Sequence, residues 1–505
     1  MNTYIRYLLA AIAGALYCAA FVGFDQWYFA WICLVPLLFA LEGVPPKQGF
    51  LLGLTFGTVA LTAGFYWITY TIHVFANMPW VVSGIGCILL SAAQGTQFAI
   101  FGLLYVWLRK RTGWSPLIIG TTTFVATEFV CPQLFPHYFA NSQYMQIPLI
   151  QICDITGVLG LTAVLVFVNA CIYLIIRDLL YQRHLRWSLI LTILGTLSIV
   201  LAYGYVRLPT IKAEMEKAPK LRFGIAQANL GIREKNRYPE RSIRLNQEQT
   251  LKLKEQGADI VVWPETAAQE PILSPGAKIL PTAIFDDLDV PILTGLFQYG
   301  YDDGHLRVYN SAALTDKEGR ILGIYKKQKL LMLGEYIPLG ESYPKLYDWF
   351  PYIGRLTPGN SNEPLRFGDY ILNVNICYEE ILPRLMRRMI AYSPNVMINI
   401  TNDNWFGRTA EPIQHLVLAA FRSVEHRMWL VRSTNTGISA FVDATGKILE
   451  QSPLMEKSTL IRDVPMMSSK TIYTRFGDWM GWLAVSLIII AAITTTLRNN
   501  LSNKR

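Results

Sequence analysis

The sequence predicts a polytopic α-helical membrane protein that carries an α/β domain in its second half. Hydrophobic residues make up 52% of the 505 residues and charged residues only 16%, and the mean hydropathy is +0.29. This composition is too apolar for one soluble domain of such length. The apolar residues also form long runs, whereas residues 220–465 show short apolar runs between charged intervals. We therefore expect most of the chain outside 220–465 to lie in lipid.

Eight apolar runs are candidates for crossing a bilayer, which takes about 20 residues for each helix. They are residues 5–23, 26–42, 50–72, 80–108, 115–131, 155–176, 187–206 and 479–497. Lys and Arg gather on alternate connections between these runs, as they do in cytoplasmic loops. These connections hold Arg6, Lys47, Arg109–Arg111, residues 177–186 and the C-terminal tail from Arg498. The sequence thus predicts that both termini are cytoplasmic and that residues 207–478 face outward.

This pattern divides the chain into three parts. They are a seven-helix transmembrane region over 1–206, an α/β domain over 220–465 and a C-terminal transmembrane helix over 479–497. Strand-like runs and helix-like intervals alternate within the middle part, which predicts strands buried on both faces. The runs are Leu221–Ala226, Ile260–Trp263, Ile292–Leu296, Tyr370–Ile376, Val396–Ile400 and Ile438–Asp443, and the intervals include Arg241–Gly257 and Pro412–Met428.

The net charge of +9 does not predict binding to nucleic acid. Basic and acidic residues nearly balance within 220–465, so the excess of Lys and Arg lies in the segments that flank the apolar runs. The basicity therefore reflects membrane topology and not a binding face. The six histidines are scattered without the spacing of metal ligands, so we expect no metal site and no cofactor.

Cys377 is the candidate nucleophile. Six of the seven cysteines precede residue 172, so this thiol has no disulfide partner in the second half of the chain. It ends the strand-like run Tyr370–Ile376 and is followed by carboxylates, which is a polar setting that suits a reactive thiol. The alternative is a half-buried cysteine that acts as a small hydrophobic residue.

Two further charged groups follow strand-like runs of the same domain. Glu265 comes after a buried run that is broken by proline, and Lys327 lies in the charged segment Tyr325–Leu330. A carboxylate can act as general base on the thiol, and a lysine can stabilise the oxyanion that forms when a thiolate attacks a carbonyl. Taken singly, Glu265 could instead be a turn or capping residue and Lys327 a surface charge.

The order Glu, Lys, Cys in the contexts Trp-Pro-Glu-Thr, Tyr-x-Lys-x-x-Leu and Cys-Tyr-Glu resembles the carbon-nitrogen hydrolase, or nitrilase, superfamily. A domain of this kind placed between membrane spans resembles the apolipoprotein N-acyltransferases of bacterial inner membranes. Further matching segments extend over nearly the whole chain. They are Asn141–Tyr144, Asp154–Gly157, Gln227–Asn229, Val308–Ser311, Asn402–Gly407 and Ser433–Ser439.

The resemblance implies a nitrilase-like αββα sandwich and a role for each site residue. Cys377 would be the nucleophile, Glu265 the base and Lys327 the oxyanion-stabilising residue. Glu335 would position the lysine, while Tyr378 and Glu379 would line the site. The oxyanion-stabilising residue could be any of three lysines, Lys326, Lys327 and Lys329. The eight-residue spacing to Glu335 favours Lys327.

This chain departs from the family's pattern at three places. Lys329 replaces a histidine, and Met332-Leu333 replace a proline and a phenylalanine. Asn236 stands where an aromatic residue is expected, which affects how lipid would be held.

The resemblance also implies an activity in lipoprotein biosynthesis. A fatty acyl chain would pass from a membrane phospholipid, with phosphatidylethanolamine as the expected donor, through a Cys377 thioester. The acceptor would be the N-terminal amine of diacylglyceryl-cysteine apolipoproteins. The protein would be a multi-pass protein of the bacterial inner membrane with a periplasmic catalytic domain.

Two other functions remain open from the residues. A membrane-tethered amidase or lipid hydrolase would use the same thioester with water as acceptor. A transporter is disfavoured because the apolar runs hold few ionisable groups besides Glu128. The aromatic segment Tyr343–Tyr352 is either an arm that dips into the membrane interface or a part of the domain core.

Overall fold

The computed structural model describes residues 1–302, 304–351, 353–468 and 470–502. The chain forms two compact units, which we describe separately. The helical unit comprises Met1–Leu208 and the C-terminal segment from Arg475, and the α/β unit comprises Pro209–Thr474. Tyr352 and the predicted basic residues Lys504 and Arg505 lie outside the described residues.

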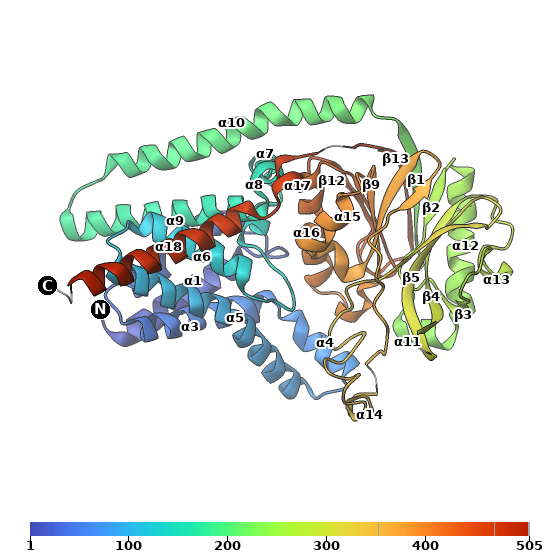
Figure 1. Ribbon diagram of the computed structural model, residues 1–505, viewed down its shortest axis with the longest axis horizontal. Helices are drawn as coiled ribbons and strands as arrows, with labels where there is room; N and C mark the ends of the chain where they lie inside the picture. Colours follow the sequence, from blue (N-terminus) through green and yellow to red (C-terminus); the bar gives the residue numbers. More distant parts are fainter. Residues whose placement is uncertain (303, 352, 469, 503–505) are drawn as a thin grey trace. The chain divides into compact units, whose positions relative to one another are not determined.

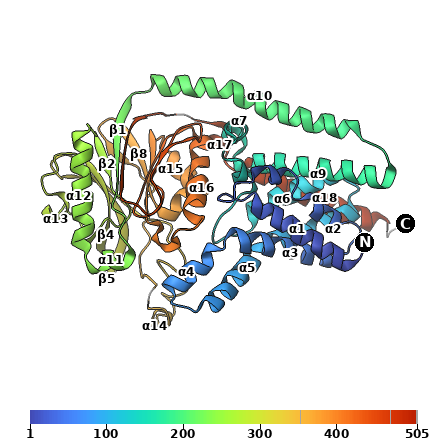
Figure 2. The ribbon, with the colours of Figure 1, turned by 180° about the vertical axis from the view of Figure 1, so that it is seen from behind.

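The helical unit consists of apolar helices of very different lengths (Figures 1 and 2). Its longer helices are α1 (Thr3–Ala19), α3 (Pro46–Gly64), α5 (Trp80–Arg111), α6 (Pro116–Val130), α9 (Val158–Gln182), α10 (Trp187–Lys217) and α18 (Trp479–Ser502). Shorter ones are α2 (Val35–Ala40), α4 (Trp67–Phe75), α7 (Ile147–Ile150), α8 (Cys153–Thr156), and the 3₁₀ turns η1 (Trp27–Trp31) and η2 (Phe139–Gln143). The helix α10 continues into the α/β unit, with Pro209 inside it.

Small residues allow close packing of α3 against α5. A Cβ added at Gly53 would collide with the carbonyl oxygen of Phe98, and one at Gly49 would lie 2.6 Å from the carbonyl oxygen of Gly102. Backbones that approach so closely gain dispersion contacts where lipid offers no hydrophobic driving force. Gly84 on α5 makes no such close contact, because a Cβ there would meet nothing within 4 Å.

Four helices of the described residues are long and apolar enough to cross a membrane. They are α5, α9, α10 and Trp479–Leu497 of α18, and the pair α3 and α4, bent by 62°, would make a fifth. Of the other predicted spans, 5–23 forms a helix of 17 residues and 115–131 one of 15 residues. The run 26–42 is divided between η1 and α2. At 1.5 Å per residue these helices fall short of a hydrocarbon layer of about 30 Å, so the count of eight remains a prediction.

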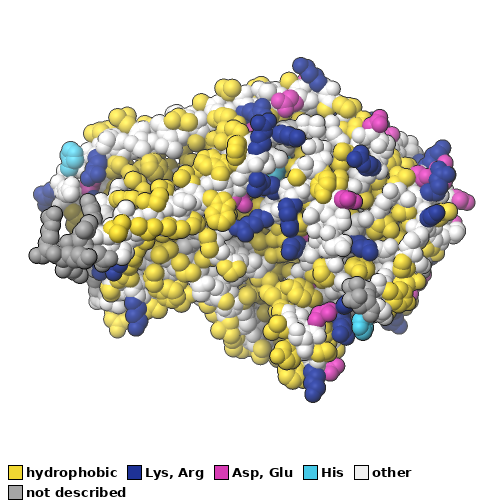
Figure 3. Space-filling model, in the orientation of Figure 1, with side chains coloured by type: hydrophobic (Ala, Val, Ile, Leu, Met, Phe, Trp, Pro, Cys, Tyr) yellow, Lys and Arg dark blue, Asp and Glu magenta, His cyan; other side chains and the backbone are white. Residues whose placement is uncertain are grey.

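Exposed apolar side chains cover the long helices of this unit. Figure 3 shows hydrophobic side chains gathered over α10 and α18. Exposed residues on these helices include Leu191, Ile199, Val206, Trp482 and Ile490. A patch of this extent in water would be a strong aggregation hazard, whereas in lipid it is the expected surface.

The α/β unit contains two β-sheets between layers of helix. The seven-stranded sheet has the order β13-β1-β2-β4-β5-β6, with β3 also paired to β4, and the six-stranded sheet has the order β12-β11-β10-β9-β8-β7. Strands of the first sheet are β1 (Lys220–Gln227), β2 (Ile260–Val262), β3 (Ala268–Leu273), β4 (Ile292–Asp302), β5 (His305–Thr315), β6 (Ile321–Lys326) and β13 (Ser458–Pro465). Those of the second are β7 (Leu365–Phe367), β8 (Tyr370–Ile376), β9 (Val396–Thr401), β10 (Leu430–Thr434), β11 (Ala440–Val442) and β12 (Ile448–Gln451).

Helices cover the outer faces of the two sheets (Figures 1 and 2). On the first sheet they are α12 (Pro239–Glu255) and α13 (Thr282–Phe285), and on the second they are α15 (Pro383–Ile390) and α16 (Glu411–His426). The short helix α11 (Ile232–Arg237) precedes α12 and lies at the end of the first sheet. The remaining short elements are α14 (Lys345–Trp349), η3 (Cys377–Ile381), η4 (Asp403–Phe406) and α17 (Ile472–Phe476), which crosses the boundary between the units. The architecture is therefore an α/β/β/α sandwich, as the resemblance implied.

Alternation along β2 shows why its run is continuously apolar. Ile260 and Val262 belong to the core between the two sheets, whereas Val261 and Trp263 belong to the core beneath α12 and α13. A strand that is covered on both faces needs apolar side chains at every position. Because the pairs β1–β2, β2–β4, β8–β9 and β9–β10 are parallel, residues that follow β2 and β8 come out at the carboxyl edges of the sheets.

Candidate active site

Glu265, Lys327 and Cys377 each follow a strand. Glu265 lies in the turn after β2, Lys327 is the first residue after β6, and Cys377 is the first residue after β8. The structure brings the glutamate and the lysine into direct contact, with 3.3 Å between Lys327 Nζ and Glu265 Oε1. Both side chains are almost fully buried. A catalytic group at a strand end is held by the rigid sheet behind it.

Lys327 lies between two carboxylates. Its Nζ donates to Glu265 and, at 2.9 Å, to Glu335. Asn310 on β5 crosses the same gap, since its Nδ2 donates to Glu265 Oε1 at 2.7 Å and to Glu335 Oε1 at 3.1 Å. Although burial acts to lower the pKa of Lys327, the charges of Glu265 and Glu335 raise it well above its ordinary value. The lysine is therefore a permanent cation at neutral pH.

The other two candidate lysines are placed elsewhere. Lys326 lies over the ring of Tyr309, with its Nζ 4.0 Å from the ring centroid. Lys329 is exposed. Lys327 has 1% of its side chain exposed and contacts both carboxylates. Its role as the oxyanion-stabilising residue stays a prediction.

Cys377 occupies a strained elbow. Its φ is 53°, in the left-handed region that residues with a side chain seldom adopt. Burial, followed by the charge of Glu265, raises the pKa of the Cys377 thiol, and the charge of Lys327 partly opposes this. The thiol is therefore protonated at rest, and a base is needed to generate the nucleophile.

Glu379 joins the cysteine elbow to the lysine loop. Its carboxylate accepts the backbone N–H of Ile376 at 2.9 Å, of Gln328 at 2.7 Å and of Lys329 at 3.0 Å, and the Tyr325 hydroxyl at 2.9 Å. Glu379 is fully buried. Four donors already occupy its oxygens, so this side chain supports the site from within rather than offering its carboxylate to a ligand.

Tyr378, the other residue expected to line the site, is half-buried. Burial, together with the nearby Tyr336, raises the pKa of its phenol to about 12. The hydroxyl thus keeps its proton throughout the neutral range and can donate a hydrogen bond.

Two family models match the chain. The apolipoprotein N-acyltransferase N-terminal domain matches residues 13–171, and carbon-nitrogen hydrolase matches residues 225–472. An apolipoprotein N-acyltransferase of Geobacter metallireducens is 29% identical over 99% of this chain and 96% of its own length. That of Bdellovibrio bacteriovorus is 28% identical over 96% of this chain and 92% of its own length. The chain belongs to the apolipoprotein N-acyltransferase family.

A solved structure of a carbon-nitrogen hydrolase from Helicobacter pylori overlaps 49% of this chain and 90% of its own length, with 18% identity and a TM-score of 0.36.

This member of the apolipoprotein N-acyltransferase family has a second buried ionic cluster that the sequence reasoning missed. Arg432 on β10 forms ion pairs with Glu380 and, at 3.1 Å, with Asp403. His415 on α16 lies beside them, with its Nδ1 3.0 Å from Arg432 Nη2. The cluster reaches the elbow through Asn399, which accepts from Arg432 at 3.3 Å and donates to the Cys377 carbonyl oxygen at 3.2 Å.

Asp403, Glu411 and His415 have potential ligand atoms within 4.8 Å of one another. The guanidinium of Arg432, however, already lies 3.1 Å from Asp403 Oδ2. A fixed cation at that place compensates the carboxylates and would repel a metal ion. We therefore interpret the three residues as part of the Arg432 cluster.

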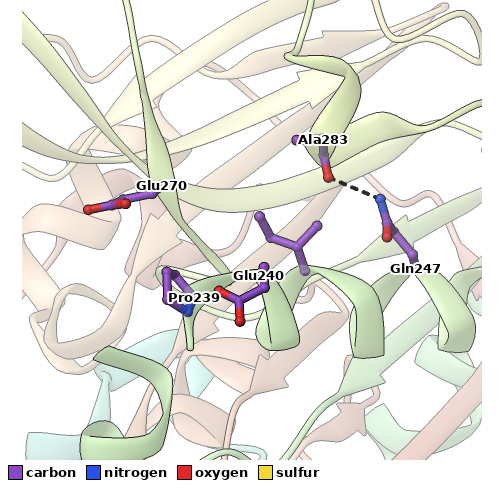
Figure 4. A pocket seen from close by; sticks show the side chains of 6 residues that line it. Pro239, Glu240, Gln247, Glu270 and Ala283 are labelled. Atoms are coloured by element: carbon purple, nitrogen blue, oxygen red, sulfur yellow. Dashed lines mark hydrogen bonds between the residues drawn. The ribbon is translucent and has the colours of Figure 1, made fainter. Parts of the chain in front are cut away.

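The same unit has a surface hollow with a volume of about 340 Å³. Its lining side chains are drawn in Figure 4. It is lined by Pro239, Glu240, Ile243, Gln247, Glu270 and Ala283, and Gln247 donates to the Ala283 carbonyl oxygen at 3.2 Å. None of the lining residues belongs to the Glu265–Lys327 site. The hollow is therefore separate from the candidate active site.

Proposed function

We propose that the chain transfers a fatty acyl group from a membrane phospholipid to the N-terminal amine of diacylglyceryl-cysteine apolipoproteins through a thioester at Cys377. The observation that carries the assignment of residues is the buried contact of Glu265 and Lys327 beside a thiol whose pKa is raised. Family membership over nearly the whole chain supports an acyltransferase.

In the first half-reaction Glu265 takes the thiol proton of Cys377. The thiolate attacks the ester carbonyl of the phospholipid, and the negative charge that develops on the carbonyl oxygen is stabilised by the Lys327 ammonium. When the tetrahedral intermediate collapses, the C–O bond breaks, and Glu265 returns the proton to the lysophospholipid alkoxide. The products are lysophospholipid and an S-acyl cysteine.

In the second half-reaction the neutral α-amine of the lipoprotein attacks the thioester. Glu265 takes one proton from the attacking nitrogen, Lys327 again stabilises the oxyanion, and the C–S bond breaks. The thiolate of Cys377 recovers its proton from Glu265. An amide replaces a thioester, so the step is thermodynamically downhill.

Glu335 and Asn310 share the hydrogen bonds of the two catalytic groups. Asn310 and Lys327 each bridge the two carboxylates. Glu335 also accepts the backbone N–H of Leu331 at 2.8 Å, which fixes its position. Lys327 thus shares its donors between carboxylates and retains directions for an oxyanion.

The acyl donor and acceptor both bring chains that water does not solvate, since each exposed methylene costs about 0.8 kcal/mol. Three aromatic residues of the segment 343–351 are exposed, namely Tyr343, Trp349 and Phe350. Tyr347 instead packs inward, with its hydroxyl accepting from the Ile337 N–H at 3.3 Å. We assign the exposed rings to contact with lipid at the membrane interface, where aromatic side chains are favoured.

We further propose the inner membrane as the location, with eight spans, the domain 220–465 in the periplasm, both termini in the cytoplasm and phosphatidylethanolamine as donor. The distribution of Lys and Arg supports this topology. Reporter fusions at residues 112, 182 and 500 should then be active as cytoplasmic reporters and one at residue 300 as a periplasmic reporter. A cytoplasmic signal at residue 300 would rule out the lipoprotein acceptor.

The acceptor experiment separates transferase from hydrolase. The purified full chain is incubated with phosphatidylethanolamine that carries a labelled acyl chain, and a diacylglyceryl-cysteine peptide is then added. A free N-terminus on the peptide should discharge the label into an amide, and an acetylated N-terminus should leave the label on the protein. Release of free fatty acid at one rate with either peptide would show a lipid hydrolase instead.

A further inference from the structure

Lys235 is a buried cation that the mechanism above does not use. It lies on α11, and only 1% of the residue is exposed. Its Nζ donates to the backbone carbonyl oxygen of Glu265 at 3.1 Å and to the Thr266 hydroxyl at 2.9 Å. The ammonium therefore contacts the turn that carries the candidate base, on its backbone side.

This turn needs support because its backbone is strained. Thr266 has φ of 50°, which is costly for a β-branched residue. Gly295 on β4 packs directly against the turn, and a Cβ there would lie 2.5 Å from both the Pro264 carbonyl oxygen and the Thr266 nitrogen. Ser242 on α12 donates to the Ala267 carbonyl oxygen at 2.8 Å. Groups from α11, α12 and β4 thus hold one turn.

The charge of Lys235 is unusual for a purely structural residue. Within the part of the chain that the structure describes, no carboxylate forms an ion pair with its Nζ. Burial lowers the pKa of Lys235 to about 7, and the charge of Glu265 opposes this. A neutral side chain could fill the same space without the desolvation cost of an ammonium. The presence of a buried ammonium beside Glu265, the proposed base, therefore indicates a role in the site.

We propose that Lys235 is a positioning residue for Glu265. It fixes the Glu265–Thr266 peptide so that the carboxylate stays against Asn310 and Lys327 while it accepts and returns protons. This inference rests on the proposed role of Glu265 as the base.

Several charged or titratable groups surround Glu265, and Lys235 differs from them in its route of action. Lys327 touches the carboxylate directly, and Glu335 lies across that lysine. Cys377 and Arg432 interact with Glu265 electrostatically. Lys235 instead contacts the backbone of residue 265, so its removal leaves every hydrogen bond of the carboxylate in place.

Lys235→Met tests the inference, because methionine has similar length and lacks the ammonium. Lys252→Met on the exposed face of α12 is the matched control. With labelled phosphatidylethanolamine, Lys235→Met should form acyl-enzyme about 10²-fold more slowly at saturating donor, the size expected for a misplaced catalytic group. The donor concentration at half-saturation should not change.

A second variant separates positioning from folding. Thr266→Val removes the hydroxyl that Lys235 contacts. Both variants therefore lose the same contact, so their reductions in the rate of acyl-enzyme formation should not add. The double variant should be little slower than Lys235→Met alone. Equal rates in Lys235→Met and Lys252→Met would overturn the inference. So would a loss of rate in Lys235→Met that tracks a lowered melting temperature and comes with a higher donor concentration at half-saturation. If the wild-type protein takes up no labelled acyl group, the proposed function itself is refuted.

Discussion

Two buried cations of the α/β unit are each held between two carboxylates, yet their surroundings differ. Lys327 lies at the edge of a sheet, between Glu265 and Glu335, and interacts electrostatically with Cys377. Its partners come from turns and loops that follow strands. The positive charge of Lys327 therefore acts on Cys377, the candidate nucleophile.

Arg432 lies within a strand, and its partners Glu380 and Asp403 come from short 3₁₀ turns. All three residues are at most 2% exposed. The arginine donates to Asn399, which in turn donates to the Cys377 carbonyl oxygen, and the charge of Arg432 also interacts with Cys377. We therefore expect similar ion pairing to serve chemistry in the Lys327 cluster and support of the elbow in the Arg432 cluster. The two cations differ in that Lys327 directly contacts Glu265, the proposed base.

Removal of Arg432 should have the largest effect, and this effect should be on folding. Arg432→Met leaves Glu380 and Asp403 buried without their cation, which costs about 3–5 kcal/mol of folding free energy. Thermal unfolding in detergent should show a markedly lower midpoint and poor yield. The double variant Arg432→Met with Glu380→Gln should recover part of the midpoint. An Arg432→Met protein with unchanged midpoint and reduced acyl loading would place Arg432 in the chemistry instead.

Removal of Lys327 should affect chemistry instead. Loss of one oxyanion donor lowers the rate by about 10²–10³-fold, so Lys327→Ala should abolish visible acyl-enzyme formation. Lys326→Ala and Lys329→Ala change the neighbouring lysines, are the matched controls and should keep most of the rate. A comparable loss in Lys329→Ala alone would show that the functional lysine lies two residues further along the chain.

Glu265→Gln should give two effects of opposite sign. Acyl loading should fall by about 10²-fold or more, because a general base is lost. Iodoacetamide should nevertheless alkylate Cys377 faster, since the charge of Glu265 raises the pKa of the thiol, and a change of one pKa unit corresponds to about tenfold more thiolate. A slower alkylation would mean that Glu265 lowers the pKa of Cys377, contrary to the geometry described above.

The smallest effect is expected from metal removal. Arg432 supplies the cation in the cluster that contains Asp403, Glu411 and His415, so dialysis against EDTA should leave acyl loading and the unfolding midpoint unchanged. A fall in either quantity that is restored by a divalent metal would show that a metal ion, and not only the guanidinium, stabilises this cluster.

Much of the α/β unit could be predicted from local patterns. The run Tyr370–Ile376 is the strand β8, and the interval Arg241–Gly257 nearly coincides with α12. Strands covered on both faces give continuous apolar runs, which are easy to recognise. Placement of Glu265 and Lys327 after strands follows from the same reasoning, because it needs only the end of each run.

The membrane helices were harder to predict because hydropathy does not report breaks. The run 50–72 contains the bend between α3 and α4, and the run 26–42 contains the interruption between η1 and α2. The close approach of α3 to α5 at Gly53 could be foreseen from the spacing of Gly53 to Gly57. At Gly84 and Gly86, by contrast, an added Cβ would meet no backbone atom of another segment within 4 Å. Whether a glycine allows two helices to pack closely therefore depends on the helix that faces it.

The supporting residues of the site could not be predicted from local patterns. Glu379 binds backbone groups of segments about fifty residues apart. The Arg432 cluster combines residues 380, 403, 415 and 432, which no periodic pattern connects. Lys235 likewise stands in a polar helix where a solvated lysine is the ordinary expectation. Such contacts depend on how distant segments pack.

Peptide-mapped mass spectrometry of the full chain after incubation with phosphatidylethanolamine is the decisive test of Cys377 as the acyl carrier. We predict that the wild type carries one fatty acyl group, as a thioester on Cys377, which hydroxylamine removes. Cys377→Ser should carry little or none, because Glu265 must then ionise a much weaker acid. An acyl group on another residue, or equal acylation in Cys377→Ser, would contradict the assignment of the nucleophile and with it the mechanism.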